Sequence, residues 1–142
     1  MKIYVGHCPE YSDELAFSDD VGARVAFARY SDKVDILEVY AHDPDPLVRR
    51  AVAQNPNTPA DVLTILAEDP DLDVQMIVAE NDNTATETLA ELASRWSSYP
   101  DVLLSIACHE HTNDETLRKL LDVPYWAVSY AAKDELRRRG LL

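Results

Sequence analysis

Residues 53–74 read AQNPNTPADVLTILAEDPDLDV, and the fold class follows from this stretch and its copies. Thr58 is followed three positions later by Asp61, the spacing of a capping box, in which a hydroxyl and a carboxylate satisfy free amides at a helix start. Further on, Asp69 and Pro70 give a second start signal, because aspartate caps a helix and proline suits its first position. The stretch therefore predicts two short helices joined by a tight turn.

The same pattern recurs along the chain at intervals of 26 to 28 residues. One column of equivalent positions holds leucine throughout, at Leu37, Leu63, Leu89 and Leu117. Four other columns keep the same register: Val48, Val74, Val102 and Val128; Val52, Val78, Ile106 and Ala132; Thr58, Thr84 and Thr112; Asn55, Asn81 and His109. Repetition at a fixed period of this length is the signature of a stacked array of small structural units.

Each unit is predicted to contain two helices. The first would cover residues 59–68, 85–95 and 113–121 in successive units, each capped by its threonine and burying leucines three apart. The second would begin at Asp43-Pro44, Asp69-Pro70 and Tyr99-Pro100. Asn55 and Asn81 would end it, since asparagine tolerates a left-handed conformation.

Neither helix of a unit can cover its apolar face alone, so we expect all-α units that stack into an α-solenoid of about four repeats. Residues 1–32 would form an N-terminal cap with a degenerate half-repeat, in which Val21 and Val25 imitate Val48 and Val52. Residues 33–142 would form the array, closed by a polar-faced helix within residues 125–142. The whole chain is predicted to be one structural unit.

The segment from Ala53 to Pro59, followed by Leu63, Leu66-Ala67, Asp69-Pro70-Asp71 and Val74, resembles the bacterial leucine-rich repeat variant (LRV) family. The resemblance covers about residues 33–114. It implies a right-handed superhelix of alternating α and 3₁₀ helices, and no particular reaction or ligand. HEAT-like α-solenoids, with longer repeats of two full α-helices, are the nearest alternative. Some family members carry a cysteine-ligated iron–sulfur cluster in an N-terminal segment, but this chain has only Cys8 there, so no cofactor is expected.

Composition narrows the class of function. A net charge of −13 disfavours direct binding to nucleic acid, whose backbone has the same sign. The basic cluster of Lys133 with Arg137, Arg138 and Arg139 fits the favourable interaction of cations with a helix C-terminus. Neither a signal peptide nor a membrane span is recognisable, and two distant cysteines cannot form a disulfide framework. A cytoplasmic protein with reduced thiols is expected.

Catalysis finds no support in the sequence. Cys108, His109, Glu110 and His111 contain possible metal ligands, but His109 occupies the Asn55 and Asn81 column and His111 precedes Thr112, so the repeat itself requires polar residues there. Acid pairs lie at predicted helix starts, and the chain has neither a glycine-rich phosphate loop nor a nucleophile elbow. We therefore expect no enzyme activity and no metal site.

A stripe of large side chains is the candidate binding site. Two residues beyond the valine column, about 200° around the helix, lie Arg50, Met76, Leu104 and Tyr130, which should point away from the core. Polar neighbours one turn later would be Gln54, Glu80, Cys108 and Asp134, with Arg49, Gln75 and Leu103 on the adjacent flank. If a two-layer array buries more of each helix, Met76 and Leu104 are core residues instead.

The function that follows is a non-catalytic interaction module that binds a basic or amphipathic protein or peptide on the repeat face. An acidic inhibitor that occupies the basic groove of a nucleic-acid-binding protein is the alternative, and a metal-dependent protein using His109 and His111 is the third. The sequence leaves the partner and the oligomeric state open.

Overall fold

A computed structural model describes residues 18–142 of the chain and shows an array of α-helices, with no strand in that range. The helices in chain order are α2 (Val21–Tyr30), α3 (Val34–Tyr40), α4 (Pro46–Gln54), α5 (Ala60–Leu66), α6 (Leu72–Glu80), α7 (Thr86–Arg95), α8 (Pro100–Ala107), α9 (Asp114–Leu120) and α10 (Trp126–Arg138). The predicted all-α helical repeat architecture is confirmed. The proposed cap at residues 1–32 lies partly outside the described residues, and His7 and Cys8 lie wholly outside them.

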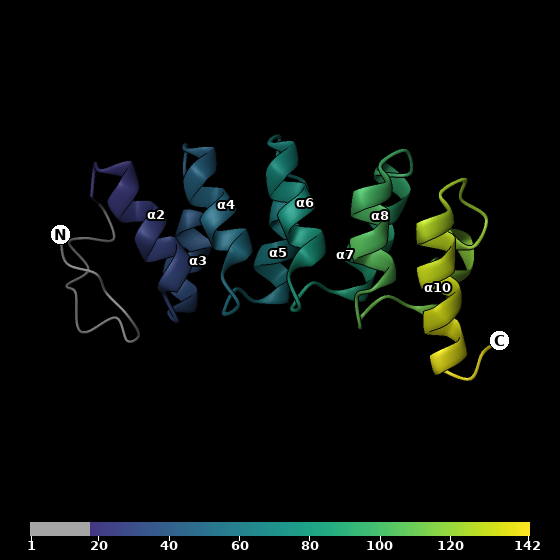
Figure 1. Ribbon diagram of the computed structural model, residues 1–142. Coiled ribbons are helices and arrows are strands. Elements are labelled where there is room, and N and C mark those ends of the chain that lie inside the picture. Colours follow the sequence, from purple (N-terminus) through teal and green to yellow (C-terminus); the bar gives the residue numbers. More distant parts are fainter. Residues whose placement is uncertain (1–17) are drawn as a thin grey trace.

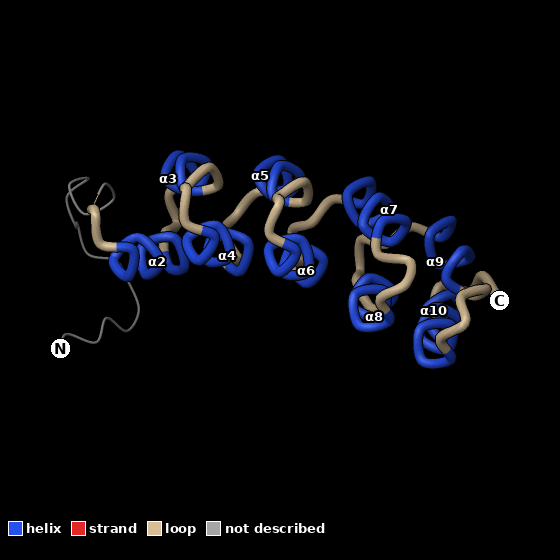
Figure 2. Tube along the Cα trace, turned by 90° about the horizontal axis from the view of Figure 1, so that it is seen from above, coloured by secondary structure: helices blue, strands red, loops and turns tan. Residues whose placement is uncertain are grey.

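The helices form two rows, because alternate helices stack on one another (Figure 1). Helices α2, α4, α6, α8 and α10 make one row, in which each helix packs on the next, and α3, α5, α7 and α9 make the other. In Figure 2 the array bends so that the first row lies on its inner side. The surface of α4, α6, α8 and α10 that points away from the other row therefore lies on the inside of the bend, and we call it the inner face.

The predicted leucine and valine columns form the core between the two rows. All four leucines of the Leu63 column are fully buried, and the valines of the Val74 column are at most 3% exposed. Ala53, Ala79 and Ala107 are also fully buried, because adjacent helices of the inner row approach closely at these small side chains. Ile77, predicted to be buried, is only partly so.

The three column threonines do not cap helices, so that prediction was wrong. Pro59 and Ala85 occupy the cap positions of α5 and α7, and Asn113 caps α9 by accepting a hydrogen bond from the Thr116 amide. The buried threonine hydroxyls instead donate backward, Thr58 to the Val52 carbonyl at 2.6 Å and Thr84 to the Val78 carbonyl at 2.5 Å. Each threonine thereby satisfies a carbonyl at the end of the preceding inner helix.

The aspartate caps of the inner row lie two residues later than predicted. Asp45 and Asp71 cap α4 and α6, whereas Asp43 and Asp69 accept hydrogen bonds from the amides of those caps. Asp43 pairs with Arg24 of α2, and Asp69 pairs with Arg49 of α4. These two aspartates therefore join neighbouring helices of the inner row rather than starting a helix. The predicted start of α8 at Tyr99-Pro100 is confirmed.

The Asp71 cap leads to a prediction about acid stability. The Arg50 guanidinium, followed by the Asp73 and Val74 amides, holds the pKa of Asp71 below its ordinary value of 3.8, although partial burial opposes the shift. A carboxyl whose pKa is depressed by folding stabilises the protein above its unfolded pKa, and that contribution is lost as the pH falls through the folded pKa.

We expect the urea midpoint to fall between about pH 5 and pH 2, and to fall less in Asp71→Asn, because asparagine also caps helices but does not titrate. Helical circular dichroism in urea at several pH values measures this. An equal fall in both proteins would assign acid sensitivity to other carboxyls.

Asn55 and Asn81 end their helices with extended backbone, at φ −71° and −76°, so the predicted left-handed stop was wrong. Their side chains reach back one repeat. The Asn81 amide donates to the carbonyls of Ala53 at 2.7 Å and Asn55 at 3.1 Å, and the Asn55 amide likewise donates to Ala28 and Ser31. These bonds form a ladder of buried asparagines that joins consecutive inner helices.

The N-terminal half-repeat exists, but its register differs from the prediction by two residues. Arg24 occupies the place of Arg49, since each pairs with an aspartate of the following repeat and donates to a carbonyl six residues earlier. Ala28 therefore corresponds to Ala53, and its carbonyl accepts from Asn55. Aligning Val21 and Val25 with Val48 and Val52 gave the wrong register, because the equivalent position of the two units is the one held by Arg24 and Arg49.

The longer third unit accommodates its two extra residues at the end of α7. Helix α7 has 10 residues, whereas α3, α5 and α9 have 7 each. Trp96 then fills the junction, 4% exposed, with its indole N–H donating to the Gln75 side chain at 3.1 Å. The short helices are α-helical rather than the 3₁₀ helices that the resemblance implied, and 3₁₀-type bonds occur at their ends, as from Glu68 to Ile65.

Candidate binding face on the inner helices

The inner face presents three rows of side chains, spaced four residues apart on each helix. The first row holds Pro46, Leu72, Pro100 and Trp126; the middle row holds Arg50, Met76, Leu104 and Tyr130; the third row holds Gln54, Glu80, Cys108 and Asp134. The first two rows are largely apolar and the third is largely polar. Residues four apart share one face of a helix, so the rows run across the array, roughly perpendicular to the helices.

The middle row is neither fully exposed nor core. Tyr130 is 62% exposed and Leu104 is 36% exposed, whereas Met76 packs partly against the core. Arg50 is held by two carboxylates, with its Nη2 at 2.8 Å from both Asp71 and Asp73. Apolar contact surface on this row is therefore concentrated toward α8 and α10.

The adjacent flank was predicted to be open, and this was wrong. Leu103 is fully buried, Gln75 is 7% exposed, and Arg49 is mostly covered and paired with Asp69. The cause is contact between units: Arg49 bonds Asp69 and the Asp43 carbonyl, and Gln75 bonds the Asp69 carbonyl and Trp96. Of the two predicted faces, only the one that lies two residues beyond the valine column is therefore available for binding.

Two exposed apolar residues lie beside the stripe and outside the predicted site. Leu72 is 56% exposed in the first turn of α6, and Tyr99 is 55% exposed just before α8. Leu72 lies one helical turn before Met76, and Tyr99 lies one turn before Leu103, the neighbour of Leu104. Together with Leu104, they extend the apolar surface from α6 to α8.

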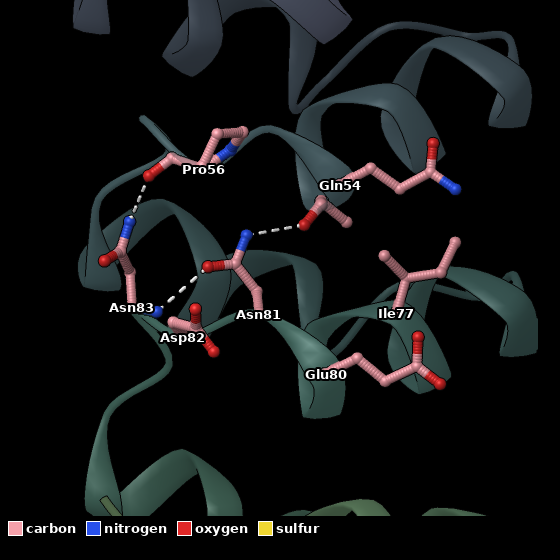
Figure 3. A pocket seen from close by; sticks show the side chains of 8 residues that line it. Gln54, Pro56, Ile77, Glu80, Asn81, Asp82 and Asn83 are labelled. Atoms are coloured by element: carbon pink, nitrogen blue, oxygen red, sulfur yellow. Dashed lines mark hydrogen bonds between the residues drawn. The ribbon is translucent and has the colours of Figure 1, made fainter. Parts of the chain in front are cut away.

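A hollow of ≈ 340 Å³ lies between the C-terminal ends of α4 and α6. Figure 3 shows Gln54 and Glu80, two residues of the predicted site, on either side of Ile77. The hollow is lined by Ala53, Gln54, Pro56, Ile77, Glu80, Asn81, Asp82 and Asn83. The hollow therefore brings Gln54 and Glu80 of the predicted site together with the apolar side chain of Ile77.

The walls of the hollow are fixed by the asparagine ladder. Asn83 donates through its side chain to the Pro56 carbonyl at 2.6 Å and through its backbone amide to Asn81 Oδ1 at 2.9 Å (Figure 3). The exposed Glu80 and Asp82 supply two carboxylates, and none of the described residues that line the hollow is basic. Its chemistry therefore suits a cationic side chain next to apolar atoms.

Arg50 marks the N-terminal boundary of this acidic region. The hydrogen bond to the Asp71 carboxylate raises the pKa of Arg50 against the opposing effect of desolvation. Its charge is therefore neutralised within the array by Asp71 and Asp73. The predicted site residue Arg50 thus fastens two repeats together and leaves the carboxylates of the hollow uncompensated.

His109 and His111 continue the ladder. His109 Nε2 lies 2.8 Å from the Asn81 carbonyl, and its Nδ1 accepts a hydrogen bond from the His111 amide. His111 Nδ1 lies 3.2 Å from the Thr84 carbonyl. Cys108 is exposed as a free thiol. Within residues 18–142, no three His, Cys, Asp or Glu side chains are placed to hold a metal ion.

None of the helices described for residues 18–142 combines the length and the apolar character needed to cross a membrane.

No curated protein and no solved structure matches the chain significantly. The model of the family described as leucine rich repeat variant matches residues 46–71. This segment contains α4, α5 and the Asp71 cap, which together form one helical repeat. Residues 46–71 thus match one leucine rich repeat variant unit, which confirms the family resemblance inferred from the sequence.

Proposed function

We propose that the protein is an interaction module whose inner face binds a segment of another protein carrying apolar side chains beside a basic one. The observation that carries the proposal is the exposed apolar surface of Leu72, Tyr99, Leu104 and Tyr130 next to an acid-lined hollow. Apolar groups rimmed by polar ones typify protein contact sites. A family of structural repeats is in keeping with such a role.

The division of labour between the two parts follows from their chemistry. Burial of Leu104 and Tyr130 against a partner would supply most of the affinity, since aromatic and aliphatic anchors dominate binding energies. Glu80 and Asp82 would select a lysine or arginine and speed association, because the net charge of −13 attracts cations. An extended or helical segment crossing α4, α6 and α8 would meet both parts.

A peptide selection tests this proposal. We expect a random peptide library displayed on phage to yield sequences that combine apolar residues with lysine or arginine. Leu104→Glu should weaken a selected peptide at least about tenfold, because it places a charge in the apolar contact. Glu80→Gln with Asp82→Asn should weaken only peptides that retain the basic residue. Fluorescence anisotropy measures the affinities.

The matched control is Ile65→Glu, the same kind of change at a 48% exposed residue of α5 in the other row. Peptides should bind this variant as they bind the wild type. If Leu104→Glu bound them equally well, the inner face would not be the site. Loss of binding with salt together with indifference to Leu104→Glu would support the acidic-inhibitor function instead.

A further inference from the structure

Helix α10 and the residues after it expose a group of apolar side chains. Trp126 is 80% exposed, Tyr130 62%, Leu142 62% and Leu141 38%. Exposed apolar groups gathered on one surface typify contact sites. The helix predicted within residues 125–142 is therefore not polar on the side that carries Trp126 and Tyr130.

This surface is the continuation of the interface between repeats. Trp126, Ser129 and Tyr130 of α10 occupy the positions that Pro46, Arg49 and Arg50 occupy in α4. In α4 those positions face the next unit, where Arg49 and Arg50 pair with Asp69 and Asp71. Helix α10 replaces both arginines with groups that cannot form such ion pairs, so the surface suits an apolar neighbour instead.

The end face also has a hollow of ≈ 490 Å³. It is lined by Leu121, Trp126, Ser129, Tyr130, Lys133 and Leu142. Leu121 lies just after α9, Leu142 follows α10, and the other four belong to α10. We call these six residues the end face.

Charge distinguishes this end from the rest of the chain. Residues 114–142 contain six basic and five acidic side chains, a net charge of +1, whereas residues 1–113 contain seven basic and twenty-one acidic, a net charge of −14. Two copies of the protein therefore repel each other through their acidic parts. Contact through the two C-terminal units is the arrangement that keeps those parts farthest apart.

We infer that the end face binds the end face of a second copy of this chain, giving a two-fold symmetric dimer joined at the C-terminal units. Such an interface uses the same patch on both copies, which suits a surface that is apolar and close to neutral. Helix α2, at the opposite end, exposes a single large apolar side chain among its described residues, Tyr30. A head-to-tail contact would therefore leave most of the apolar end face poorly matched. Trp126 and Tyr130 also belong to the inner face, so the dimer would cover the α10 end of the proposed binding surface; Leu104→Glu tests the binding function without touching the end face.

Sedimentation velocity over a wide range of concentration tests the dimer. The mass of the wild-type chain should rise from 15.9 kDa toward twice that value and stop there. Trp126→Ser should raise the dissociation constant at least about tenfold, because a large aromatic side chain at the centre of an interface carries much of its binding energy. Leu142→Ser should weaken the dimer as well.

Tyr30→Ser is the matched control, since it removes a tyrosine of 67% exposure from the other end of the array. It should leave the dimer unchanged. Added salt should strengthen the dimer, because it screens repulsion between the acidic parts while apolar contact persists. A chain that stays monomeric throughout, a mass that grows beyond two copies, or a dimer weakened by salt would each overturn the inference.

Discussion

Asn81→Asp is expected to destabilise the array by about 3–5 kcal/mol, the range found when a buried charge loses its partners. The substitution keeps the shape of the side chain and replaces the amide nitrogen with oxygen. That nitrogen donates to the Ala53 and Asn55 carbonyls, and the residue is 8% exposed. A carboxylate there would face two carbonyl oxygens with no donor between them. Urea unfolding followed by helical circular dichroism measures the change.

The same substitution at Asn113 is the control. Asn113 is exposed and caps α9 through its side-chain oxygen, which aspartate also provides. Asn113→Asp should therefore change the free energy of unfolding by less than about 0.5 kcal/mol. Protonation of the new carboxyl in Asn81→Asp restores one donor, so the deficit should shrink in acid. Equal effects at both sites would show that the ladder does not join the repeats.

Arg49→Met is expected to cost about 2–4 kcal/mol, because it leaves the Asp69 carboxylate covered and unpaired. Arg49 Nε lies 2.7 Å from Asp69 Oδ2, and the side chain of Asp69 is 5% exposed. The arginine also donates to the Asp43 carbonyl at 2.7 Å. Methionine preserves the apolar stem and removes only the guanidinium, so the loss reports the charge and its hydrogen bonds. The free energy of unfolding in urea measures it.

Two further variants isolate the pair. Asp69→Asn in the Arg49→Met background should recover part of the stability, since asparagine still accepts the hydrogen bond from the Asp71 amide. Lys119→Met removes the cation of an exposed pair with Glu115 and should leave the urea midpoint unchanged. If Arg49→Met behaved like Lys119→Met, the arginine would contribute nothing to the junction.

The sequence was most informative where apolar residues repeat. The Leu63 and Val74 columns predicted the core and the two helices per unit, because helical period and burial are local properties of the pattern. Polar columns were recognised as positions but were given the wrong partners. Thr84 and Asn81 were assigned roles at their own helix ends, whereas Thr84 bonds the preceding helix and Asn81 bonds the preceding repeat. Capping rules describe bonds within a few residues and cannot find partners 28 residues away.

The candidate site was predicted in part for a similar reason. The periodicity identified the face that holds Leu104 and Tyr130, but it could not show that Arg50 is engaged by Asp71 or that Leu103 is fully buried. Both outcomes depend on neighbouring units. The hollow beside Glu80 forms only when α4 and α6 stack, so no single repeat contains it.

The asparagine ladder has a consequence for the length of the protein. Removing residues 55–80, one complete unit, would join Gln54 directly to Asn81. Asn81 would then stand where Asn55 stands, and its amide would meet the carbonyls of Ala28 and Ser31. The asparagine bonds would therefore survive loss of a whole unit, whereas Arg49 and Arg50 would lose Asp69 and Asp71, which lie in the removed segment. The ladder is thus the part of the junction that is interchangeable between units, and the arginine pairs tie one particular unit to its own neighbour.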